Sequence, residues 1–202
     1  MNTPNVEAVK LDELNCWRIR HGQAEVLVAQ QGAHILSYQI DGQPPIIWLN
    51  DKAVFKTGKS IRAGVPVCWP WFGNLQRNPA SVQAMRVSNE PAPAHGLVRA
   101  LDWELGEIGT TDGGLTVEFI LPVPENGLPG WPHQVDLRLS IRLDEQLHIN
   151  LTSHNRGTDS VIGNGGMTEA LQLLRQRRRQ MRGVRLHMPV IQAGAGRRHH
   201  SK

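Results

Sequence analysis

Short stretches in which hydrophobic and polar residues roughly alternate make up much of the first 160 residues. A period of two is typical of strands that bury one face, whereas a helix repeats its hydrophobic positions every three or four residues. Turn signals such as Gln31-Gly32, Asp41-Gly42 and Asp112-Gly113-Gly114 separate these stretches. The pattern predicts strands over Ala24–Gln30, Ala33–Ile40, Ile46–Leu49, Leu101–Gly106, Leu115–Pro122, His133–Arg142 and Leu147–Ser153.

The fold class follows from the close spacing of these strands and the absence of a strong helical period. Both features predict an all-β protein, built as an antiparallel sandwich or barrel. A chain of 202 residues is long enough for one domain with a sizeable core. We divide it into an N-terminal arm (residues 1–9), a β-sandwich (residues 10–171) and a C-terminal tail (residues 172–202).

Charge and aromatic content change towards the C-terminal end. Residues 1–160 hold 13 Lys and Arg against 17 Asp and Glu, whereas residues 161–202 hold 9 against 1, the single acid being Glu169. The six Trp, the three Phe and the single Tyr all lie before residue 132. The net charge of +4 therefore comes from the C-terminal part, which has a different composition from the sandwich.

Several classes of protein are not indicated. The two cysteines, Cys16 and Cys68, lie far apart and belong to no Cys/His cluster, so we expect neither a disulfide scaffold nor a metal site, and no cofactor. Residues 1–10 contain no apolar run typical of a secretory signal, and no apolar stretch is long enough to span a bilayer. The expectation is a soluble cytoplasmic monomer that binds no membrane.

Two segments differ from ordinary strand sequence. Residues 59–73 read KSIRAGVPVCWPWFG, and residues 93–99 read PAHGLVR. Because a strand interior tolerates proline poorly, Pro66 and Pro70 predict an edge, a bulge or an irregular crossing. Rigid loops rich in Trp, Gly and Pro are a plausible way for a β-sandwich to build a sugar site.

Each candidate side chain in these segments has a functional and a structural interpretation. The ring of Trp69 could stack on a pyranose, or it could close one end of the core together with Trp71 and Phe72. The guanidinium groups of Arg62 and Arg99 could bind phosphate, or each could form a surface salt bridge. His95 could face a sugar hydroxyl, or it could be a structural histidine in a tight turn.

Residues 61–73 followed by Ala-His-Gly-Leu-Val-Arg at 94–99 resemble the signature of the hexose-6-phosphate mutarotases, the glucose-6-phosphate 1-epimerases of the aldose 1-epimerase superfamily. Flanking features agree, among them Gln31-Gly32-Ala33-His34 and Trp131-Pro132-His133, and the resemblance runs in order between residues 10 and 160. One departure is Ala63, where the family usually has glycine. Alanine should be tolerated there unless the backbone needs a positive φ.

The resemblance implies a galactose-mutarotase-like supersandwich of antiparallel strands and a reaction that interconverts the α and β anomers of a hexose 6-phosphate. Such a reaction needs an acid at the ring oxygen and a base at the anomeric hydroxyl. By resemblance, Arg62 and Arg99 bind the substrate at or near its phosphate. Trp69 is added to the substrate-binding residues on its residue type, because its ring could stack on the sugar. His95 faces the sugar as a hydrogen-bonding or proton-transfer partner, and no metal takes part.

The principal catalytic pair of this family is absent from the chain. The family acid is a histidine in Ala-Leu-His-x-Tyr-Phe, but here Glu169-Ala170-Leu171 is followed by Gln172-Leu173-Leu174. Our hypothesis is a frameshift at about residue 172, which makes the tail out-of-frame and explains its arginine content. We therefore expect a truncated sandwich with open strand edges and no activity. The alternative is a non-catalytic carbohydrate-binding sandwich.

The basic tail could instead bind nucleic acid, because clustered arginines meet phosphates with little need for sequence. Against this, no aromatic residue lies among the arginines, no fold motif accompanies them, and residues 193–196 resemble a disordered segment. We expect no nucleic-acid partner, and a tail that is disordered or marginally helical between Met167 and Gly183. The arginines concerned are Arg175, Arg177, Arg178 and Arg179.

Overall fold

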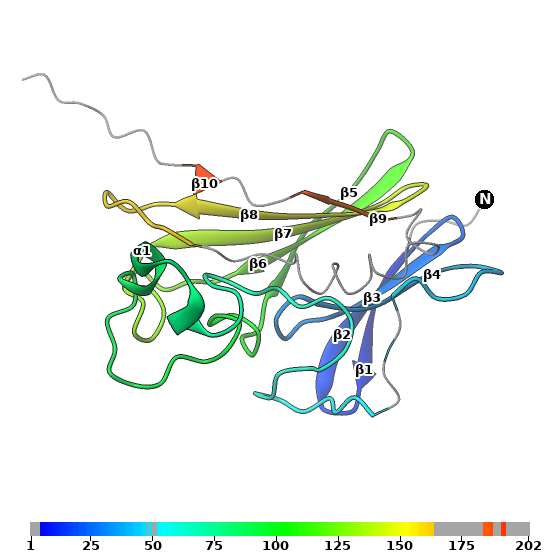
Figure 1. The fold of residues 1–202 in the computed structure, drawn as a ribbon. Helices are drawn as coiled ribbons and strands as arrows, with labels where there is room; N and C mark the ends of the chain where they lie inside the picture. Colours follow the sequence, from blue (N-terminus) through cyan, green and yellow to red (C-terminus); the bar gives the residue numbers. More distant parts are fainter. Residues whose placement is uncertain (1–4, 48, 50–51, 164–183, 188–190, 193–202) are drawn as a thin grey trace, which may run out of the picture.

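The computed structural model describes residues 5–47, 49, 52–163, 184–187 and 191–192 of the chain. Within this part, strands form two sheets whose facing side chains share one hydrophobic core (Figure 1). This arrangement confirms the predicted all-β sandwich. Only two short helical turns occur among the described residues, the 3₁₀-helix η1 (Leu75–Arg77) and the helix α1 (Ala80–Gln83), and neither could cross a membrane.

The first sheet is an antiparallel meander of four strands in the order β1-β2-β3-β4. The strands are β1 (Asn5–Leu11), β2 (Leu14–His21), β3 (Ala24–Ala29) and β4 (His34–Ile40). The predicted strands at β3 and β4 are confirmed, whereas β1 and β2 were not predicted. The reason is that most of β1 is exposed and charged residues interrupt β2, so neither shows a clear alternation. Residues 5–9 of the expected N-terminal arm lie in β1.

The second sheet contains the antiparallel strands β5 (Glu104–Thr111), β6 (Gly114–Leu121), β7 (Val135–Leu143) and β8 (Leu147–Asn155). Every second residue of β7 and β8 is buried over most of their length, as the sequence pattern predicts. The buried residues face one another across the sheet, for example Phe119 and Leu139, and Leu139 and Leu151. These cross-strand pairs form one side of the main core.

Two predicted strands differ from the structure. The strand predicted over Leu101–Gly106 begins three residues later, because residues before β5 bond the β3–β4 turn: Gly32 N–H donates to Leu101 O and Trp103 N–H donates to Gln30 O. The strand predicted at Ile46–Leu49 is reduced to a single bridge between Ile47 and Tyr38. Local alternation cannot reveal that these segments bond a turn or form a lone bridge.

Two short parts of the tail also have regular structure. β9 (Val184–His187) and β10 (Ile191–Gln192) each pair with β8 in parallel. For these six residues the expectation of a disordered or marginally helical tail differs from the structure. The physical reason is that the outer edge of β8 presents unpaired N–H and C=O groups, to which any extended segment can add.

β3 is buried on both faces over most of its length. Val26 and Val28 face the main core between the sheets, whereas Leu27 and Ala29 face a second, smaller cluster. This second cluster is completed by side chains of the segment after residue 52, and its buried members are Leu14, Cys16, Leu27, Ala29, Leu36, Phe55 and Ile61. Its position fixes the segment that carries the first motif against the first sheet.

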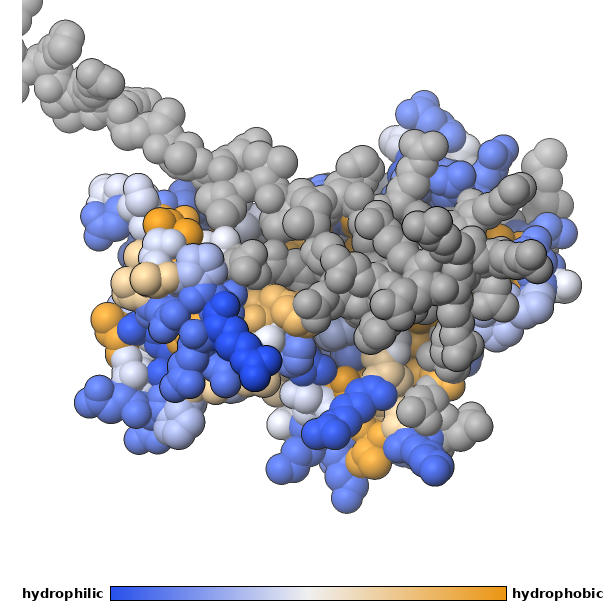
Figure 2. Space-filling view, viewed as in Figure 1, coloured by the Kyte–Doolittle hydropathy of each residue, from blue (hydrophilic) through white to orange (hydrophobic). Residues whose placement is uncertain are grey.

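The exposed surface is mainly polar. Figure 2 shows hydrophilic side chains over much of the described surface on this face, with hydrophobic residues in separate patches. Among the described residues, the large hydrophobic side chains that are exposed are those of Val54, Val87, Ile108 and Ile162. Single exposed hydrophobic residues are normal and indicate no interface.

Gly64 generates the first testable prediction. Its φ is +60°, and a Cβ would fall on the backbone of Ile35 and Leu36. Gly64→Ala should therefore lower the free energy of unfolding by roughly 1 kcal/mol for the left-handed backbone and a further 1–3 kcal/mol for the clash. Gly42 has a φ of +75° and open space around it, so Gly42→Ala should cost only about 1 kcal/mol. Urea unfolding compares the two, and equal losses would contradict the packing of residues 61–65 against β4.

Candidate functional site

The two motif segments lie next to each other in the structure. Trp69 and Gly96 form a parallel bridge, and Leu97 N–H donates to the Trp69 carbonyl at 2.7 Å. Gly96 has a φ of +81°, and a Cβ there would overlap the Trp69 backbone, so only glycine fits. Residues 61–73 form isolated bridges and no regular strand, so of the three arrangements expected from Pro66 and Pro70, an edge, a bulge or an irregular crossing, the structure shows the last.

His95 is held at the junction of the two segments. Its N–H donates to the Gly73 carbonyl at 2.8 Å, and its Nδ1 accepts a hydrogen bond from Gly73 N–H at 3.3 Å. Because Nδ1 is an acceptor, the proton of the neutral ring lies on Nε2. The ring is half-buried and meets Phe72 edge-on, with 4.6 Å between the centroids. These contacts fix both the tautomer and the orientation of the ring.

Arg99 reaches the first motif from the second. Its Nη2 donates to the Ile61 carbonyl at 3.1 Å. Its Nε is buried and has no hydrogen-bond partner among the described residues. A buried guanidinium N–H without a partner is costly, so this edge of Arg99 is suited to an anionic oxygen.

Arg62 lies directly after the residue that Arg99 contacts. Its side chain is exposed, and no hydrogen bond or ion pair engages it within the described part of the chain. Lys56, Lys59 and Arg62 follow one another with no acidic residue between them. The structure thus brings Arg99 against the segment that carries Arg62 and the exposed Lys56 and Lys59.

Trp69 lies in the main core. It is 4% exposed, and its ring meets Trp131 in a T-shaped contact with 4.6 Å between the centroids. Trp71 is 1% exposed, and its Nε1 donates to the Pro93 carbonyl at 3.0 Å. Both positions favour the interpretation of these rings as core residues. As a substrate contact, Trp69 stays a prediction.

Two buried polar residues were not recognised as functional from the sequence. Gln31 is 2% exposed; its Nε2 donates to the Lys59 carbonyl at 2.8 Å, and its Oε1 accepts from Gly58 N–H at 2.7 Å. His34 is 1% exposed, and its Nε2 donates to the Ala63 carbonyl. The sequence signal was present, since both residues stand in the quoted segment Gln31–His34, but spacing alone did not assign them a partner.

Burial lowers the pKa of His34 from 6.5 to about 4. The hydrogen bond with Ala63 opposes this shift, and the charge of Arg99 adds to it. His34 is therefore neutral near pH 7, which avoids a second buried charge beside Arg99. Ala63 itself has no positive φ, which agrees with the expectation that alanine is tolerated at this position.

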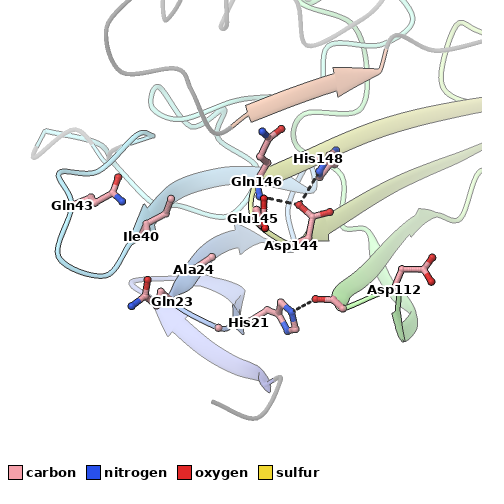
Figure 3. Close-up of a pocket in the computed structure, with 12 residues that line it drawn as sticks. His21, Gln23, Ala24, Ile40, Gln43, Asp112, Asp144, Glu145, Gln146 and His148 are labelled. Carbon is pink, nitrogen blue, oxygen red and sulfur yellow. Dashed lines mark hydrogen bonds and ion pairs between the residues drawn. The ribbon is translucent and has the colours of Figure 1, made fainter. Parts of the chain in front are cut away.

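A polar pocket of about 870 Å³ lies elsewhere, at the hairpin turns of both sheets (Figure 3). His21 Nε2 lies 2.6 Å from the Gly113 carbonyl oxygen, and Asp144 is paired with His148 at 3.0 Å and with Arg142 at 3.1 Å. None of the four predicted site residues lines this pocket. Since the carboxylate of Asp144 is already paired with His148 and Arg142, and none of the motif residues reaches this pocket, we assign it no function.

Some expectations fall on residues outside the described part. These include Gln172, the arginine cluster at 175–179 and the segment Met167–Gly183. Among the described residues, no three His, Cys, Asp or Glu side chains are grouped so that they could hold a metal ion.

Comparison with known proteins gives consistent results. A family model described as aldose 1-epimerase matches residues 15–167. The "Putative glucose-6-phosphate 1-epimerase" of Escherichia coli K12 is 38% identical over 152 residues, which cover 75% of this chain and 48% of that protein. A protein of the same name from Salmonella typhimurium is 35% identical over the same shares of both chains. The chain thus spans about half the length of these relatives.

Solved structures show the same fold. The crystal structure of a "putative mutarotase" from Salmonella typhimurium has a TM-score of 0.61 and 32% sequence identity, over 74% of this chain and 46% of that one. A "galactose mutarotase-like protein" from Clostridium acetobutylicum has a TM-score of 0.55 over 71% of this chain and 47% of that one. Its identity is 14%, so this likeness shows the fold alone. The expected galactose-mutarotase-like sandwich is confirmed.

The buried, neutral His34 generates a prediction about pH. The unfolded chain takes up a proton near pH 6.5, whereas the folded protein takes it up near pH 4, so the free energy of unfolding should fall as the pH drops through this window. The contribution of His34 should be about 2–3 kcal/mol between pH 7 and pH 4. Urea unfolding at both pH values measures it.

His34→Gln is the matched variant, because glutamine keeps an N–H donor for Ala63 but does not titrate in this range. Carboxylates also titrate between pH 7 and pH 4, and comparison with the variant subtracts their effect. The variant should lose less stability than the wild type by the stated amount. An equal loss in both proteins would show that His34 is not held neutral by burial.

Proposed function

Because the chain belongs to the aldose 1-epimerase family, we propose that it is the N-terminal part of an enzyme that interconverts the α and β anomers of a hexose 6-phosphate. The observation that carries the proposal is the junction of the two motif segments. Across it, hydrogen bonds tie Arg99 to Ile61 and His95 to Gly73, beside the exposed Arg62. Two arginines and an oriented histidine on one rigid junction suit a phosphorylated sugar.

Each group has a chemical part in this proposal. Arg62 and the unpaired Nε of Arg99 bind oxygens of the phosphate, where guanidinium groups form charge-assisted hydrogen bonds. His95, oriented through its Nδ1, presents its Nε2 side to a sugar oxygen. Ring opening moves a proton from the anomeric hydroxyl to a base while an acid protonates the ring oxygen. Rotation about C1–C2 and closure of the ring return both protons, so the reaction consumes and releases no proton overall.

The catalytic acid and base are the missing parts. By family resemblance the acid would stand at the position of Gln172, and the base nearer the C-terminal end of a complete relative. The family match ends at residue 167, which supports our division between a sandwich to residue 171 and an unrelated tail. Sequencing the DNA around codon 172 tests the frameshift. If neither alternative reading frame over codons 173–179 encodes family-like residues such as Tyr-Phe, the hypothesis is excluded.

A second candidate function is carbohydrate binding without catalysis. The observation that favours it is Gln172, because an amide cannot serve as the proton donor of the reaction. Binding of glucose 6-phosphate without anomer exchange, in a protein that carries a complete C-terminal half, would support this candidate over the first.

Arg62→Ala tests the binding site directly. Loss of a charge-assisted hydrogen bond to phosphate should weaken glucose 6-phosphate binding by about 10–100-fold. Arg138→Ala is the matched control, since Arg138 is also exposed and forms a surface salt bridge with Glu118 on the second sheet. Titration followed by NMR or calorimetry measures both affinities. Equal affinities of the two variants would contradict the role of Arg62.

Anomer exchange tests the reaction. The chain alone should interconvert the anomers of glucose 6-phosphate no faster than buffer, as followed by exchange NMR. A chimera of residues 1–167 with the C-terminal half of the Escherichia coli relative should raise the exchange rate by at least about 100-fold, the usual contribution of positioned proton transfer. A folded chimera that binds the sugar phosphate without exchange would exclude the enzyme and leave the binding protein.

A further inference from the structure

We propose that Gln31 is a positioning residue for Arg62, which it acts on through the backbone of residues 58 and 59. The proposal rests on the substrate-binding role proposed for Arg62 and adds a residue to that site. Gln31 lies in the turn between β3 and β4, far from Arg62 in sequence, and it contacts the segment only through its side-chain amide.

The segment from residue 58 to residue 65 forms no regular strand: it turns at Gly58, bends at Lys59 and again at residues 63–64, and forms only a single bridge with β4, at Val65. Its odd-numbered carbonyl groups each accept a hydrogen bond from a single group elsewhere in the chain. Lys59 O accepts from Gln31, Ile61 O from Arg99, Ala63 O from His34 and Val65 O from the Ile35 N–H. Side chains therefore do for this segment what a neighbouring strand does in a regular sheet.

Two buried side chains fix this segment against the first sheet. Ile61, 1% exposed, enters the second hydrophobic cluster, and Val65, 0% exposed, enters the main core. Arg62 is exposed and lies between two anchored carbonyls, those of Ile61 and Ala63. Because the backbone on both sides of Arg62 is held, its side chain starts from a fixed position at the surface.

Among the three side chains that anchor this segment, those of Gln31, His34 and Arg99, Gln31 is the one for which the described residues show two bonds to it. Its amide accepts from Gly58 N–H and donates to Lys59 O, at 2.7 Å and 2.8 Å, so it copies the two bonds of a strand residue. A primary amide is the side chain that supplies a donor and an acceptor without charge. At 2% exposure, water could replace neither bond.

The same turn also holds the second arginine. Gln31 forms a bridge with Asp102, and Gly32 N–H donates to Leu101 O at 2.7 Å. A Cβ at Gly32 would lie 2.6 Å from the Arg99 carbonyl oxygen, so the turn is packed tightly on the segment that carries Arg99. The turn at residues 31–32 thus sets the position of Arg62 through the side chain of Gln31 and that of Arg99 through its backbone.

Hydrogen exchange of single amides in the full chain tests the local part. Gln31→Met removes both hydrogen bonds but keeps the length of the side chain. The Gly58 amide should then exchange at least about tenfold faster, whereas the Val65 amide, which bonds Ile35, should keep its protection. Gln39→Met is the control, since Gln39 is exposed on β4 and bonds only Glu25. Unchanged exchange at Gly58 would overturn the proposal.

A double-mutant cycle with glucose 6-phosphate tests the functional part. Gln31→Met should weaken binding about tenfold when Arg62 is present, and by less than about twofold in the Arg62→Ala background. A purely structural role would weaken binding by the same factor in both backgrounds, and that result would overturn the proposal. So would unchanged affinity in the presence of Arg62.

Gln31→Glu provides a rescue experiment. A protonated carboxylic acid offers one donor and one acceptor, as the amide does, whereas the ionised form repels Lys59 O. The affinity of this variant, divided by that of the wild type at each pH, should rise as the pH falls from 8 to 5. The ratio cancels the titration of the ligand, and a flat ratio counts against Gln31. Failure of the proposed function would be recognised separately. In that case the wild type does not bind glucose 6-phosphate, although Gln31→Met still accelerates exchange of the Gly58 amide.

Discussion

Backbone hydrogen bonding of residues 58–65 is the constraint on which the candidate site depends. A segment packed against a sheet needs a partner for each buried N–H and C=O group, and here a strand supplies one only at Val65. The partners come instead from Gln31, His34 and Arg99, together with one bridge to β4. The hydrogen bonds that satisfy the backbone groups of this segment therefore also hold Arg62 and Arg99 in position.

Much of the fold could be predicted from the sequence because its strands bury one face. β6, β7 and β8 alternate clearly, and their predicted bounds agree with the structure to within two residues at each end. β1 and β2 were not predicted because exposed and charged residues weaken their alternation. β3 is covered on both faces, so its run of apolar residues shows that the strand is buried but not which face each side chain occupies. The pairing of β9 with β8 depends on a free strand edge of the folded sheet, which the sequence around either strand does not reveal.

The candidate site was predictable in its components but not in their connections. Motif spacing selected Arg62, His95 and Arg99, and the structure brings their segments together. Trp69 was selected by residue type, which cannot distinguish a ring that stacks on a sugar from one that packs on Trp131. Gln31 could not be assigned a role from the sequence, because the role proposed for it depends on two hydrogen bonds to residues 58 and 59, which are distant in the chain.

The spacing of the anchored carbonyls between residues 59 and 65 also limits how this region can change in evolution. Substitutions at exposed positions leave the backbone anchors in place, so the composition of the exposed surface can drift. Insertion or deletion of one residue would instead shift the segment against its anchors, so that Ile61 could no longer keep both its place in the second hydrophobic cluster and the hydrogen bond of its carbonyl with Arg99. The length of this segment should therefore be far more constant among homologues than the identity of its exposed side chains.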